Sequence, residues 1–79
     1  MNSITVRSKV QSLLTRGEVQ EAVAHLQEFY TDNRVLLNDL KEEEVNLFLE
    51  KRQVNPLVLE FLVKKIIEKS DKDGYNYFI

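Results

Sequence analysis

The sequence predicts an all-α fold, a small bundle of four helices in a single domain that spans residues 1–79. The first observation is that apolar residues recur with helical spacing in four segments, which are separated by helix start and stop signals. The second is that two glycines and one proline are too few for the many turns of an all-β fold. The third is a composition of 43% hydrophobic and 30% charged residues, which is typical of a globular chain.

The first helix is predicted at about residues 3–16. Ser3 is the expected N-cap, because its hydroxyl can accept a hydrogen bond from a free N–H of the first turn. Gly17 can adopt the left-handed conformation that ends a helix. The apolar residues that share one face are Val6, Val10, Leu13 and Leu14.

The second helix, at about residues 18–31, has the clearest apolar pattern. Its apolar face comprises Val19, Ala22, Val23, Leu26, Phe29 and Tyr30. Because only Gly17 separates it from the first helix, the two should form a helical hairpin. The link that follows should include a short turn near residues 34–37, whose apolar side chains plug the core.

The third helix is predicted at about residues 39–53, with Asp39 and Glu42 at the spacing of a capping box. The fourth is predicted at about residues 56–69, because Asn55 and Pro56 suit the N-cap and the first helical position. The fourth helix is apolar on most of its sides, so it is expected to be the central one. Residues 70–79 are then expected to form a polar loop and an aromatic C-terminal tail.

The residues needed for catalysis are missing, so we expect no enzyme, no catalytic residues and no cofactor. The chain has no cysteine, and its one histidine, His25, lies on the flank of the second helix without a nucleophile at a suitable spacing. No metal site is expected either, because consecutive carboxylates such as those of residues 42–44 point in different directions around a helix. The Asp71-Lys-Asp73-Gly74 segment departs from the ligand spacing of a calcium loop.

Charge and hydropathy limit the classes of partner. Residues 18–50 hold nine acids and two bases, a balance of −7, which repels phosphate and makes nucleic-acid binding through this region unfavourable. The basic ends of the chain remain candidates for DNA contact. The apolar stretch of residues 57–67 contains three charges and is too short to span a membrane, and no signal peptide is visible. We therefore expect a cytoplasmic protein.

Two features indicate binding to a protein partner or to a second copy in a homodimer. Leu47 points away from the apolar face of the third helix, and with Leu36 or Leu37 it could contribute to an exposed apolar patch. Tyr75, Tyr77 and Phe78 add a large aromatic group near the C-terminus. The alternative for both features is ordinary core packing.

About two thirds of the chain resembles a family, the C-terminal domain of the bacterial replication-initiation proteins DnaD and primosomal DnaB. The corresponding segments are Phe29-Tyr30-Thr-Asp-Asn33, residues 42–49, residues 54–59, and Tyr75-Asn-Tyr-Phe-Ile79. The last segment is similar to the family's Tyr-x-x-x-Ile-x-x-x-Trp motif, although the tryptophan position lies beyond Ile79 and the family's basic tail is missing.

The resemblance implies a non-enzymatic helical module of replication initiation that contacts DNA, a helicase loader or itself. The missing basic tail weighs against the DNA contact. The alternative function is that of a small stand-alone regulator, of phage or plasmid type, which binds one host or phage protein and modulates or inhibits it.

Overall fold

The computed structural model describes the backbone of residues 2–77 and the side chains of residues 2–74, and this part of the chain is helical without strands. The elements are α1 (Ser3–Thr15), α2 (Val19–Asp32), the short 3₁₀ helix η1 (Arg34–Leu37), α3 (Glu42–Lys51) and α4 (Pro56–Tyr77). The prediction of a small all-α bundle with a turn near residues 34–37 is therefore confirmed.

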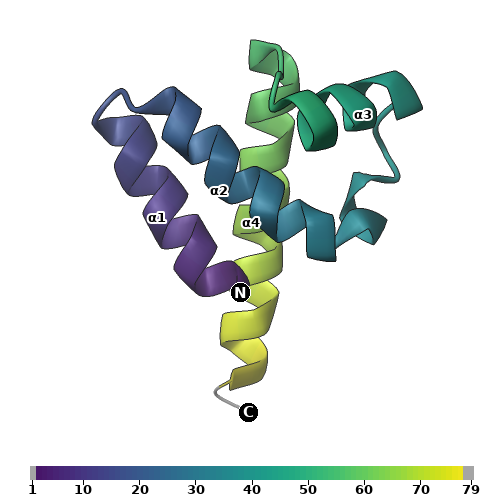
Figure 1. Ribbon diagram of the computed structural model, residues 1–79. Coiled ribbons are helices and arrows are strands. Elements are labelled where there is room, and N and C mark those ends of the chain that lie inside the picture. Colours follow the sequence, from purple (N-terminus) through teal and green to yellow (C-terminus); the bar gives the residue numbers. More distant parts are fainter. Residues whose placement is uncertain (1, 78–79) are drawn as a thin grey trace.

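The helices α1, α2 and α3 are arranged around α4, which is the longest element (Figure 1). The hairpin of α1 and α2 packs on α4, while α3 and η1 lie on the other side of α2 from α1 (Figure 1). Gly17 makes the tight turn of the hairpin with a φ of 78°. The N–H of Glu18 then donates to the carbonyl of Leu13 over 2.9 Å, which closes the end of α1 as predicted.

Tyr30 lies at the centre of the core and is fully buried. Its hydroxyl donates to the main-chain carbonyl of Leu62 on α4 over 2.7 Å. Its ring makes edge-to-face contacts with Phe29, at 5.2 Å between centroids, and with Phe48 of α3, at 5.9 Å. This one side chain therefore joins α2 to both α3 and α4.

Two helix starts differ from the prediction. The N-cap of α1 is Asn2, whose Oδ1 accepts from the N–H of Thr5 over 2.8 Å, and Ser3 is instead a buried residue of the first turn. α3 begins at Glu42 and not at Asp39, with Lys41 in extended conformation at the N-cap position. The Asp39 carboxylate instead lies 3.0 Å from Nζ of Lys65 on α4. In this position Asp39 does not cap a helix.

The start of α4 agrees with the sequence, since Oδ1 of Asn55 accepts from the N–H of Val58 over 2.9 Å. Burial of α4 is narrower than expected. Among its side chains up to residue 74, which the structure describes, the buried ones form a single stripe of Val58, Leu62, Ile66 and Ser70. Leu57 is 78% exposed, so one side of the axial helix remains open.

The expected polar loop after residue 69 is wrong, because α4 continues through Tyr77. Contacts with α1 explain the continuation. Arg7 donates to the buried Ser70 hydroxyl over 2.8 Å and pairs with Asp71, and the buried Ser3 hydroxyl donates to Asp73. We call these five residues the polar clamp. Their side chains satisfy one another between two helices, which local turn propensity does not reveal.

Candidate functional site

α3 is the least buried of the helices with described side chains, and it is the centre of the candidate site. Phe48 is its single buried residue. Gln27 of α2 holds its C-terminal end: Nε2 donates to the carbonyl of Leu49 over 2.6 Å, while Oε1 accepts from Nε of Arg52 over 3.0 Å. α3 is therefore anchored by one fully buried aromatic side chain and one bridging amide, with Val45 and Leu49 half-buried against the core, and six of its ten residues are exposed.

The contact residues proposed from the sequence differ in how far their side chains are exposed. Leu47 is 43% exposed, which confirms that it points away from the core. Leu36 is half-buried and packs against the core, so less of its side chain is open to a partner. The backbone of Tyr75 and Tyr77 belongs to the last turn of α4, but their side chains and all of Phe78 lie outside the described residues.

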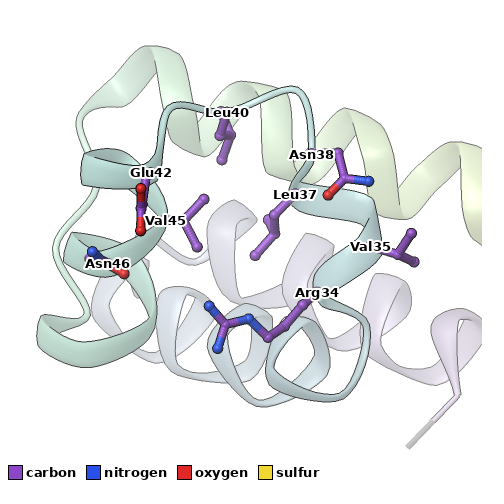
Figure 2. A pocket seen from close by; sticks show the side chains of 8 residues that line it. All are labelled: Arg34, Val35, Leu37, Asn38, Leu40, Glu42, Val45 and Asn46. Carbon is purple, nitrogen blue, oxygen red and sulfur yellow. The ribbon is translucent and has the colours of Figure 1, made fainter.

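A hollow of about 450 Å³ lies between η1 and the start of α3 (Figure 2). Leu37 and Val45 point toward one another across it, and Leu40 approaches from the connecting segment (Figure 2). The polar side chains that line it are Arg34, Asn38, Glu42 and Asn46. We call it the η1–α3 hollow. It has an apolar floor and a rim of mixed charge.

A second hollow, of about 630 Å³, lies at the other end of α3, and we call it the α3–α4 groove. Its apolar lining comes from Val19, Val23, Val54, Pro56 and Leu59, and its polar lining from Gln20, Lys51, Arg52 and Gln53. Both charged residues of this lining are basic. Lys51 and Arg52 directly follow the acidic stretch of residues 18–50, so the groove lies where the charge of the chain changes sign.

Arg52 at the rim of this groove has an unusual backbone conformation. Its φ of 53° and ψ of 33° are left-handed, and it is the one non-glycine residue with positive φ in the described chain. The N–H of Gln53 donates to the carbonyl of Leu47 over 3.1 Å, so the last turn of α3 closes with a bond one residue longer than the Glu18–Leu13 bond that closes α1. An arginine at such a position costs about 1–2 kcal/mol more than in ordinary helical geometry.

Four exposed large apolar residues of the described chain were not proposed as contacts from the sequence: Ile4, Val19, Val35 and Leu57. The expectation that Val19 belongs to the buried face of the second helix is wrong, because it is the first residue of α2 and is 42% exposed. Val35 and Leu57 are the most exposed of the four. Val35 of η1 is 72% exposed and Leu57, in the first turn of α4, is 78% exposed. A helical projection could have identified Leu57, because it lies about 100° from the buried Val58 and further from Leu62. Val35 offered no such signal, since a single 3₁₀ turn is too short to show a periodic pattern.

The α3 side of the molecule presents apolar contact surface rather than a cluster of reactive side chains. Among the described residues no group of three or more His, Asp or Glu side chains could hold a metal ion together. None of the helices in the described range is long and apolar enough to cross a membrane. Comparison with protein families, with curated proteins and with solved structures finds no match to this chain.

Proposed function

We propose that this chain is a non-enzymatic protein-interaction module that binds a protein partner on the side carrying α3. The observation that carries the proposal is the grouping of apolar surface there. Leu47 is exposed on the helix itself, Val35 is exposed on the adjoining η1, and hollows with apolar floors lie at both ends of α3. Exposed apolar surface bordered by polar residues is typical of protein interfaces.

The polar borders also suit an interface. Charged or amide side chains surround the apolar floor of each hollow, as in the rim of a typical protein contact. α3 itself has three glutamates at its first turn and Lys51 in its last, so a partner meets opposite charges at its two ends. Such a pattern orients a partner as well as attracting it.

The resemblance to the DnaD and primosomal DnaB domain supports a more specific form of the proposal, an adaptor in replication initiation. The acidic middle of the chain supports the rival form, a stand-alone regulator of one protein. DNA binding separates the two. An adaptor that contacts DNA should bind it with strong salt dependence, and a dedicated regulator should not bind it.

Leu47→Lys tests the interaction surface. Because Leu47 is exposed, a charge there should leave the fold intact, with a change in stability of at most about 1 kcal/mol. Binding should be lost in affinity capture from a bacterial lysate, with nuclease treatment and identification by mass spectrometry, and self-association should be lost in sedimentation velocity. Gln11→Lys, at an exposed site on α1, is the matched control and should retain both. Equal capture by Leu47→Lys and the unmodified chain would place the interaction elsewhere.

A further inference from the structure

We propose that the α3–α4 groove binds an acidic amphipathic segment of a partner protein, which inserts apolar side chains into the groove and places carboxylates beside Lys51 and Arg52. The inference rests on the proposed function, because it names the chemistry of the partner on the same side of the molecule. Three features of the groove support it: its apolar floor, its charge and the conformation of Arg52.

The floor of the groove joins elements that are far apart in sequence. Val19 and Val23 come from the start of α2, and Val54, Pro56 and Leu59 come from the α3–α4 link and the start of α4. Val19 is 42% exposed, and Val54 and Leu59 are half-buried. At about 630 Å³ the groove lies within the usual range of binding pockets. It therefore has room for apolar anchors of a partner, which would cover side chains that water now reaches.

The charge of the groove selects the sign of the partner. Lys51 and Arg52 are both exposed, and neither pairs with a carboxylate among the described side chains. No acidic side chain lines the groove. Glu18, which precedes Val19 of the groove lining, pairs with Arg16 at 3.2 Å. A carboxylate of a partner would thus meet two available cations, whereas a lysine would be repelled.

Arg52, at the rim of the groove, has a left-handed backbone. Glycine would close the end of α3 without steric cost, as Gly17 does at the end of α1. Arginine has instead the strained left-handed backbone, and Gln27 holds its Nε at 3.0 Å. The bond to Gln27 uses Nε, and the two terminal nitrogen atoms of the guanidinium make no hydrogen bond to the described side chains. A bidentate pair with a carboxylate uses such a geometry.

Two other occupants are conceivable on charge grounds, and the test separates them. A second copy of this chain could present its acidic residues 42–44, and a nucleic acid could present phosphates. The amphipathic segment is favoured because five apolar residues line the groove, and a phosphate backbone would leave them uncovered. A segment of mixed acidic and apolar character matches the whole lining.

The probe is a fluorescein-labelled peptide of about twelve residues, with leucines at i, i+3 and i+7 and glutamates between them, measured by fluorescence polarisation. We expect it to bind the full chain, with an affinity that falls several-fold between about 50 and about 500 mM salt. A peptide with lysines in place of the glutamates should bind at least about tenfold more weakly. Amide NMR shifts should change most at Val19, Val54 and Leu59.

Arg52→Gly separates a binding role from a structural one. Glycine relieves the left-handed strain, so the Tm should stay the same or rise by up to about 5 °C. The affinity for the acidic peptide should nevertheless fall roughly threefold to tenfold. Lys51→Gln should show a similar loss, whereas Lys9→Gln, at an exposed position on α1 outside the groove, is the matched control and should leave the affinity unchanged.

Val19→Glu tests the floor. It adds an acid at the first residue of α2, where the helix dipole favours negative charge, so the fold should persist. The acidic peptide should bind this variant at least about tenfold more weakly. Unchanged affinity in both Arg52→Gly and Val19→Glu, or equal binding of the acidic and basic peptides, would overturn the inference.

Failure of this inference is distinct from failure of the proposed function. If the acidic peptide does not bind at about 1 mM but a protein is captured by the unmodified chain and lost with Leu47→Lys, the groove inference falls and the interaction module stands. If the peptide does not bind and protein capture is lost with neither Leu47→Lys nor Arg52→Gly, both the groove inference and the proposed function fall. If the chain self-associates and Arg52→Gly abolishes that association, the groove belongs to a second copy and the inference is overturned. If DNA but not the peptide displaces the captured protein, the groove belongs to a nucleic acid and the inference is again overturned.

Discussion

Phe48→Ala gives a quantitative test of how α3 is attached. Phe48 is the only buried side chain of α3 and is fully enclosed, with its ring 5.9 Å from that of Tyr30. Replacing a buried phenylalanine by alanine costs about 3–5 kcal/mol, because the fold loses the free energy of burying the ring and retains a cavity in its place. The lost edge-to-face contact is included in that range, at about 0.5–1.5 kcal/mol.

A domain of this size has little stability to spare, so the loss should be large in relative terms. Each kcal/mol lowers the Tm of a 60–100-residue domain by about 4–8 °C, and the variant should therefore melt at least about 12 °C lower. Urea unfolding followed by circular dichroism measures the free-energy change. Leu47→Ala, at the adjacent exposed position, is the control and should change stability by less than about 1 kcal/mol.

The two measurements distinguish global unfolding of the Phe48→Ala variant from local detachment of α3. If the whole domain is destabilised, α3 belongs to the same cooperative unit as α1, α2 and α4. If amide exchange accelerates in α3 alone, the helix detaches locally while the rest stays folded. A cost below about 1 kcal/mol by both measurements would refute the reasoning, since it would mean that Phe48 does not hold α3 on the core.

Two further predictions concern pH. Burial, with a smaller contribution from Glu68, raises the pKa of Tyr30, so its neutral form is favoured in the fold. The stability that this group contributes is fully present below the unfolded pKa of about 10 and is lost as pH rises above it. Tyr30→Phe should remove that alkaline decline, and by deleting the bond to the Leu62 carbonyl it should cost about 1–2 kcal/mol at neutral pH. Urea unfolding at a series of pH values measures both effects. The hydrogen bond from Ser3, with help from Lys69, lowers the pKa of Asp73, so its contribution is present above the unfolded pKa and lost as pH falls through the folded one. Ser3→Ala should therefore move the acid-unfolding midpoint to higher pH, and an unchanged midpoint would show that the contact between α1 and the end of α4 does not act in solution.

Local sequence signals located most of the fold. The apolar face of α2 and the Asn55-Pro56 start of α4 depend on residues within a few positions of one another, so they are visible in the sequence. The end of α4 is not. Residues 70–74 resemble a turn when considered alone, and they remain helical because their partners lie on α1, 63–70 residues earlier.

The candidate site also has parts that the sequence predicts and parts that it does not. The exposure of Leu47 followed from its angle on a helix, which needs only the helical period. The α3–α4 groove did not, because Val19 and Leu59 are separated by forty positions and meet only in the folded chain. The left-handed Arg52 was also invisible, since the residues that usually reveal this conformation are glycine and asparagine.

The polar clamp has a consequence for the order in which the chain can fold during synthesis. α1 and α2 are neighbours in sequence and can pair as soon as both have been made, a local step that is fast. The clamp partners of Ser3 and Arg7, however, are translated 63–70 residues later. α4 carries these clamp partners and also the core residues Val58, Leu62 and Ile66, so a nascent chain would hold the apolar face of the hairpin uncovered until most of α4 has left the ribosome. Protection from proteases should therefore arise late and in one step.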